Sequence, residues 1–98
     1  MSWYRITLPR SEASIKVAEL ALDFHDTLQV AESRDGIALF RQKPVSGSNM
    51  EVFYISLNTP SPSERFREFY KAEECSPPEP YSVEHFGGDE SVLALDRS

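Results

Sequence analysis

The feature that most restricts the fold is a long amphipathic stretch, residues 11–31, that follows a short segment of alternating apolar side chains. Its apolar residues recur at spacings of three or four, which is typical of a helix with one face toward a core. Lys16, Glu19 and Asp23 fall on the opposite side, and Ser11 is the expected N-cap. The apolar positions are Ala13, Val17, Leu20, Ala21, Phe24, Leu28 and Ala31, with Ile15 and Leu22 widening the stripe.

Three segments alternate apolar and polar side chains with a period of two, as strands do. They are residues 2–8, 37–42 and 51–57. The turn-forming loop 43–49 between the last two predicts an antiparallel hairpin with a long tip. One face of the sheet would then carry the core residues Tyr4, Ile6, Leu8, Ile37, Leu39, Phe53, Ile55 and Leu57.

A second helix is expected after residue 60. Ser61 suits an N-cap, Pro62 the first helical position and Glu64 the third, which together form a capping box. The helix must end by Ser76, because Pro77 and Pro78 cannot continue it. Its predicted inward side chains are Phe66, Phe69 and Tyr70.

Residues 81–86 predict a fourth strand, with Tyr81 and Val83 on the core face. The order strand–helix–strand–strand–helix–strand resembles the ferredoxin-like arrangement. We therefore expect one α+β domain over residues 1–98. It would be a two-layer sandwich, with a four-stranded antiparallel sheet and two helices on one face.

The stretch after residue 86 contains Gly87–Gly88–Asp89–Glu90, the first four letters of the diguanylate cyclase signature GG(D/E)EF. Ser91 stands where that signature has Phe, and the predicted first strand carries no acidic residue for a metal. We therefore interpret the stretch as a glycine turn with Asp89 as a helix cap. A short helix over residues 92–95 is favoured over a fifth strand.

The sheet face turned away from the helices is unusually aromatic for a surface facing water. A large exposed apolar patch usually marks an interface or a ligand groove. Three alternatives follow: residues 92–95 cover the face, two copies stack on it, or it binds a ligand or another protein. The candidate binding residues on this face are Trp3, Arg5, Phe40, Tyr54 and Phe86, beside Ala38 and Val52.

The formal net charge of −6 is concentrated toward the C-terminal end. No Lys or Arg occurs between Glu73 and Glu90, which makes this segment a candidate acidic patch for a basic partner. An acidic surface repels phosphate backbones, so nucleic-acid binding is not expected. The patch residues are Glu73, Glu74, Glu79 and Glu84.

No catalytic constellation stands out. Cys75 is the only cysteine and lies among acids, which raise a thiol pKa. His25 and His85 have no second His or Cys at metal-ligand spacing, so we expect neither a metal nor a cofactor. The N-terminal MSWYRITLPR shows no apolar signal segment and no apolar run is long enough to cross a membrane, which favours a cytoplasmic protein.

The sequence thus predicts a non-catalytic interaction or regulatory module that binds another protein or a second copy of itself. It would use the aromatic face, the acidic segment 73–90, or both. The alternative is a small-molecule-binding protein or enzyme of the dimeric α+β-barrel type, with Arg5, Tyr54 and His85 in a pocket on the open face. A third and weaker alternative is an acidic mimic of nucleic acid.

Overall fold

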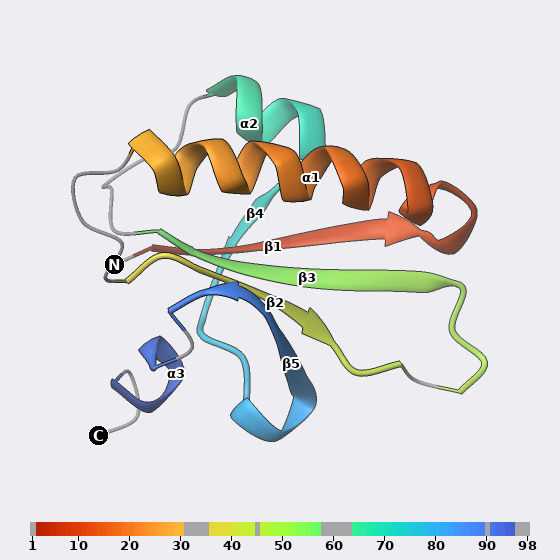
Figure 1. Cartoon of the computed structure of the whole chain (residues 1–98). Helices are drawn as coiled ribbons and strands as arrows, with labels where there is room; N and C mark the ends of the chain where they lie inside the picture. The colour runs from red at the N-terminus through yellow and green to blue at the C-terminus, as the bar shows by residue number, and fades with distance from the viewer. Residues whose placement is uncertain (1, 31–35, 45, 58–63, 90, 96–98) are drawn as a thin grey trace.

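The computed structural model describes residues 2–30, 36–44, 46–57, 64–89 and 91–95. Figure 1 shows the elements in chain order: β1 (Ser2–Pro9), α1 (Arg10–Val30), β2 (Ala38–Gln42), β3 (Met50–Leu57), α2 (Glu64–Tyr70), β4 (Glu73–Cys75), the 3-10 turn η1 (Pro80–Ser82), β5 (Val83–Gly88) and α3 (Val92–Leu95).

The strands form one antiparallel sheet with the order β4-β1-β3-β2-β5. The predicted hairpin is confirmed, since Ala38 pairs with Ser56 and Arg41 with Phe53. The predicted four-stranded ferredoxin-like sandwich is wrong, because the sheet has five strands. The place beside β1 belongs to β4, and the predicted last strand lies at the other edge as β5, beside β2.

The fifth strand exists because α2 ends earlier than expected. Lys71 adopts a left-handed conformation with φ 52°, and the Ala72 N–H donates to the Arg67 carbonyl at 3.0 Å. This is the hydrogen bond of a Schellman cap, which usually has glycine at the left-handed position. The helix therefore stops at Tyr70, which leaves enough chain before Pro77 to form β4.

α1 begins at Arg10, directly after β1, so the prediction that Ser11 caps it is wrong. The Arg10 N–H instead donates to the Asn49 carbonyl of the hairpin loop at 2.7 Å. The cap residues Ser61 and Pro62 predicted for the second helix lie outside the described residues. So does Ala31, the last apolar position predicted for the first helix.

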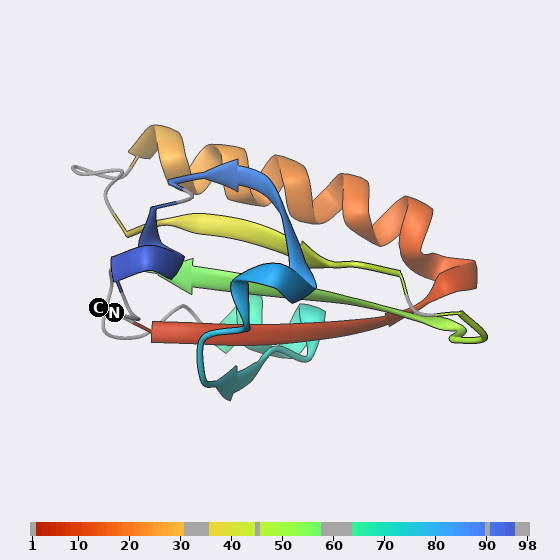
Figure 2. The same ribbon diagram turned by 90° about the horizontal axis from the view of Figure 1, so that it is seen from below.

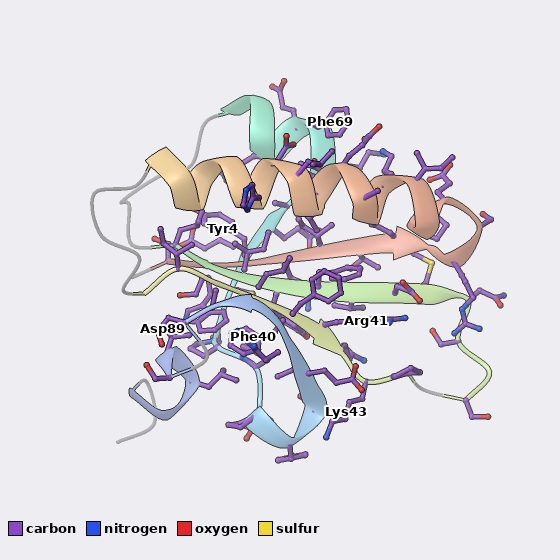
Figure 3. All side chains as sticks on the ribbon, in the orientation of Figure 1. Tyr4, Phe40, Arg41, Lys43, Phe69 and Asp89 are labelled. Carbon is purple, nitrogen blue, oxygen red and sulfur yellow. The ribbon has the colours of Figure 1, made fainter. Side chains whose placement is uncertain are left out.

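One core lies between the sheet and the helices, and we call it the helix-side core. Figure 3 shows its side chains beneath α1, with Tyr4 labelled. The predicted strand alternation is confirmed here, since every core position expected in residues 2–8, 37–42 and 51–57 is buried. The members are Tyr4, Ile6, Leu8, Leu20, Ile37, Leu39, Phe53, Ile55, Leu57, Tyr70 and Ala72. In addition, the Tyr70 hydroxyl donates to the Asp23 carboxylate at 2.5 Å, which ties α2 to α1.

A second core lies on the opposite face of the sheet. Its members are Trp3, Ala38, Phe40, Val83, Val92 and Leu93, with Tyr54 and Cys75 packed against it. Residues 76–82, which we call the strap, cross this face from β4 to β5, as Figure 2 shows from below. The Lys43 N–H donates to the Ser82 carbonyl at 2.9 Å and fastens the strap to the end of β2. The chain thus covers both faces of its own sheet.

Candidate functional site

The predicted aromatic face is closed. Trp3 is 4% exposed and Phe40 1%, with their ring centroids 5.9 Å apart. Val92 and Leu93 of α3 belong to the same cluster, at 0% and 7%. Of the three alternatives for this face, covering by residues 92–95 is therefore the one that the structure shows. Neither Trp3 nor Phe40 presents surface to a ligand or to a second copy.

The chain turns at Gly88 and Asp89, between β5 and the covering helix α3. Gly88 has φ +80°, and the Asp89 N–H donates to the Ile37 carbonyl at 2.8 Å. The Asp89 carboxylate accepts the Ser91 N–H at 3.0 Å and the Ser91 hydroxyl at 2.5 Å. These hydrogen bonds lower the pKa of Asp89. The predictions of a glycine turn, an Asp89 cap and a short helix are confirmed.

Of the remaining residues of the predicted aromatic site, Arg5 and Tyr54 stand opposite each other in the β1–β3 ladder, whereas Phe86 lies apart from them. Arg5 is exposed on β1 and pairs with Glu73 across the β1–β4 ladder at 2.9 Å. Tyr54 is half-buried at the margin of the second core. Phe86 is 47% exposed, and its ring centroid lies 6.2 Å from that of Phe53 in the helix-side core. The assignment of Phe86 to the open face is therefore wrong.

An irregularity in β5 explains the error. The β2–β5 register shifts between Leu39 and Phe40, where Leu39 pairs with Gly87 and Phe40 with His85. The extra residue is Phe86, and a bulge of this kind changes which face the flanking side chains reach. Val83 accordingly enters the second core instead of the first, and Tyr81 is 75% exposed in η1, contrary to expectation.

His85, and not Phe86, stands opposite Phe40 in the β2–β5 ladder. Its ring lies 5.6 Å from that of Phe40 in an edge-on arrangement. Its Nε2 lies 2.9 Å from the Gly88 carbonyl oxygen, which can only accept, so Nε2 carries the proton. His85 thus braces the turn that leads to α3.

The acidic residues of segment 73–90 do not form one patch. Glu73 and Glu74 lie on β4 at one edge of the sheet, and Glu84 lies on β5 at the other. Glu79 belongs to the strap between them, and Glu84 stands opposite Arg41 in the β2–β5 ladder. All four are exposed, but the sheet separates them.

Cys75 lies half-buried against the second core. Burial raises the pKa of its thiol, an effect that the nearby Arg5 guanidinium partly offsets. A protonated thiol is a poor nucleophile, and the Cys75 side chain packs against the second core. Among the described residues, no three His, Cys, Asp or Glu side chains gather closely enough to hold a metal ion. Within the same residues, no helix is long and apolar enough to span a membrane.

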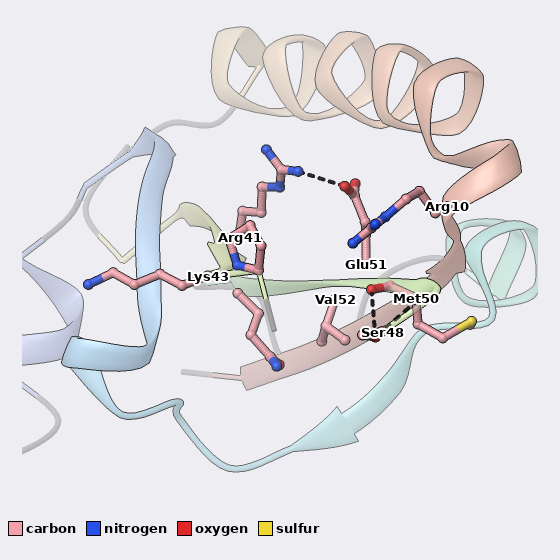
Figure 4. A pocket seen from close by; sticks show the side chains of 9 residues that line it. Arg10, Arg41, Lys43, Ser48, Met50, Glu51 and Val52 are labelled. Atoms are coloured by element: carbon pink, nitrogen blue, oxygen red, sulfur yellow. Dashed lines mark hydrogen bonds and ion pairs between the residues drawn. The ribbon is translucent and has the colours of Figure 1, made fainter. Parts of the chain in front are cut away.

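A cluster of basic residues lies at the loop end of the β2–β3 hairpin, and the sequence analysis did not predict it. A hollow of about 40 Å³ is lined there by Arg10, Arg41, Lys43 and Glu51, with Gln42, Pro44, Ser48, Met50 and Val52. Arg41 Nη2 lies 2.6 Å from Glu51 Oε1. In Figure 4, Arg41 and Arg10 lie on either side of Glu51, while Lys43 extends away from them. The register of the hairpin places residues 41 and 51 diagonally across neighbouring strands, and the sequence predicted the hairpin but not this register.

The outward side of α1 carries apolar side chains in solvent. Ile15 is 68% exposed and Leu22 65%, so the expectation that they widen the buried stripe is wrong. On α2, Phe69 is 48% exposed, and the Lys16 ammonium lies 5.3 Å above its ring. Phe69 was predicted to point inward, whereas its neighbour Tyr70 does so.

Comparisons of the chain with protein-family models, with curated proteins and with solved structures find no match. The fold and its surfaces are therefore the basis for any functional assignment.

Proposed function

We propose that this protein is a protein-binding module whose contact surface is the outward side of α1. The observation that carries the proposal is the exposure of Ile15 and Leu22, at 68% and 65%. Singly exposed apolar residues are common on protein surfaces. Two large ones on the same side of one helix are the arrangement that a docking partner buries.

The spacing of these residues supports a continuous contact line. Leu22 comes seven positions after Ile15, which is close to two helical turns, or about 10 Å along the axis. Ala18 lies between them on nearly the same side and is also exposed. Leu20, in contrast, points into the helix-side core and is fully buried. The helix thus has one apolar side for its own core and a second for a partner.

The charges that border this line favour a particular kind of partner. Glu12, Glu19 and Asp23 are exposed along one flank of it. The basic residue of that region, Lys16, lies over the ring of Phe69. A second copy docked by the same surface would place acids against acids. The surface therefore fits a different protein, one with an apolar centre and a basic rim.

This proposal keeps the interaction role expected from the sequence and moves it to another surface. The aromatic face is unsuitable because Trp3 and Phe40 are buried beneath the protein's own strap and α3. The acidic residues Glu73 and Glu84 lie on opposite edges of the sheet and do not make one contact area.

Replacing Leu22 by Asp tests the surface, because this change places a charge in the centre of the apolar line. The control is Ser76→Asp, which adds the same charge at an exposed position of the strap. Partners captured from the source cell by the wild type are identified, purified and titrated against all three proteins. We expect Leu22→Asp to weaken binding at least about tenfold, which corresponds to roughly 1.4 kcal/mol, and Ser76→Asp to leave it unchanged. Equal affinities for Leu22→Asp and the wild type would contradict the proposal.

A further inference from the structure

We infer that the hollow at the loop end of the β2–β3 hairpin binds a small dianionic oxyanion of the phosphate type. The ladder between β2 and β3 ends at the pair Arg41–Phe53, whereas β2 and β3 themselves continue to Gln42 and back to Met50. The two strands therefore separate before they reach the loop that joins them, and the hollow lies at this loop end of the hairpin.

The charge of the lining is opposite to that of the whole protein. The lining contains three basic residues, Arg10, Arg41 and Lys43, and one carboxylate, Glu51, which gives a formal local charge of +2 in a chain of net charge −6. Like charges brought together repel one another, and an anion bound between them removes that repulsion. The positive lining thus selects the sign of the ligand.

Arg41 and Arg10 are the residues placed to contact the anion. Arg41 uses Nη2 for Glu51, and a guanidinium has five N–H donors in a planar fork, so other donors remain for a ligand. Among the described residues, no ion pair engages Arg10. Its backbone is fixed by the hydrogen bond to the Asn49 carbonyl at 2.7 Å. Both guanidinium groups therefore extend from anchored backbone, Arg41 from β2 and Arg10 from the first residue of α1.

Lys43 has a different part in the site. Its backbone N–H is held by the Ser82 carbonyl at 2.9 Å, while its side chain is exposed and extends away from Arg41 in Figure 4. Because the Lys43 ammonium points away from the two guanidinium groups, it attracts an approaching anion more than it binds one directly. Neutralising Lys43 should consequently cost less affinity than neutralising Arg10.

The size of the hollow limits the ligand to a small group. A single water needs about 10–15 Å³ measured in the same way, so about 40 Å³ holds a tetrahedral oxyanion and not a drug-sized molecule. Gln42 and Ser48 add neutral polar groups to the lining. The planar fork of an arginine matches pairs of phosphate oxygens, and a local charge of +2 matches a dianion.

The test is a titration of the full ¹⁵N-labelled protein with inorganic phosphate, at an ionic strength held constant with sodium chloride. We expect saturable shifts of the amide signals of residues 41–43 and 48–52. Sulfate should produce the same shifts, because it carries the same charge and geometry. Acetate should bind at least about fivefold more weakly.

Three variants make the test specific. Arg10→Gln should weaken phosphate binding about fivefold or more, and Lys43→Gln about twofold. Lys71→Gln removes an exposed charge at the end of α2 and should leave binding unchanged. The inference is overturned if the shifts do not saturate, if acetate binds as tightly as phosphate, or if Arg10→Gln binds phosphate like the wild type. The Arg10 and Lys43 charges are exposed, so their removal leaves the fold intact for the measurement.

Discussion

The indole of Trp3 and the ring of Phe40 lie 5.9 Å apart beneath the strap and α3, in the centre of the second core. The two residues come from strands that are not neighbours in the sheet, since β3 lies between β1 and β2. Aromatic pairs at this separation contribute about 0.5–1.5 kcal/mol beyond the burial of their area. The pair is therefore an interior feature, and it packs in one cluster with Val92 and Leu93 of α3.

Truncating the cover of this pair should loosen the second core. Leu93 is 7% exposed, and Leu93→Ala should lower the free energy of unfolding by about 2 kcal/mol or more. Trp3 is the single tryptophan, so its emission should shift to longer wavelength and its quenching by acrylamide should increase. Leu22→Ala is the matched control, since Leu22 is 65% exposed and its loss should cost less than about 0.5 kcal/mol. Equal costs for the two variants would show that α3 does not seal the core.

The left-handed residue at the end of α2 predicts a stabilising substitution. Lys71 has φ 52°, a conformation that costs a residue other than glycine about 1–2 kcal/mol. Glycine removes this cost but loses more backbone entropy on folding, so Lys71→Gly should gain roughly 0.5–1 kcal/mol in chemical denaturation. Lys16→Gly, inside α1, should instead lose about 1 kcal/mol. A loss of stability in both variants would contradict the proposed cap.

The sequence predicted the long inner strands of the sheet correctly, but it did not predict where α2 ends or that β4 follows it. Alternation in residues 2–8 and 51–57 placed their side chains on the correct faces, because both strands are long and lie inside the sheet. The end of α2 carries Lys71 where a glycine would have signalled a stop. The following strand, Glu73–Cys75, has three residues and no apolar alternation, so its existence depends on pairing with β1 and not on its own pattern.

The candidate sites were missed for a related reason. The bulge at Phe86 and the separation of β2 from β3 beyond Arg41 depend on how the strands pair, which a single sequence does not display. Arg10, Arg41 and Lys43 line one hollow only because the hairpin returns to the start of α1. In contrast, the turn at Gly88 and the cap at Asp89 are local, and both could be predicted from adjacent residues.

Tyr70 should make the stability fall at high pH. Burial and the hydrogen bond to Asp23 raise the pKa of its hydroxyl above the ordinary value of about 10. Above pH 10 the unfolded chain then releases a proton that the folded protein retains, so the free energy of unfolding decreases as the pH rises. Below pH 10 this contribution is fully present.

The variant Tyr70→Phe isolates that effect. It should lose about 1 kcal/mol at pH 7, because one hydrogen bond disappears. Between pH 10 and 11 the wild type should lose stability faster than the variant, by up to about 1.4 kcal/mol per pH unit. Urea denaturation at pH 7, 9, 10 and 11 measures both quantities. Parallel pH profiles would mean that the Tyr70 hydroxyl is not protected from ionisation.

Gly47 and Gly88 have nearly the same φ, so replacing each by alanine separates the cost of backbone strain from the cost of steric overlap. Gly47 has φ +84° and Gly88 φ +80°, so alanine at either site pays for a left-handed conformation, about 1–2 kcal/mol. At Gly47 an added Cβ meets nothing within 4 Å. At Gly88 it would lie 2.2 Å from the Ile37 carbonyl oxygen and 2.8 Å from the Ala38 Cα, both of which are backbone atoms.

Gly88→Ala should therefore cost at least about 2 kcal/mol more than Gly47→Ala, since the end of β5 must move away from β2 to admit the methyl group. The same movement breaks the bond from the Asp89 N–H to the Ile37 carbonyl and weakens the seating of α3. Amide hydrogen exchange should thus accelerate at residues 87–89 and 91–95 in Gly88→Ala, and Trp3 should become accessible to acrylamide. Gly47→Ala should change neither signal. If both variants lose the same stability and keep Trp3 protected, the turn at Gly88 does not hold the C-terminal cover in place.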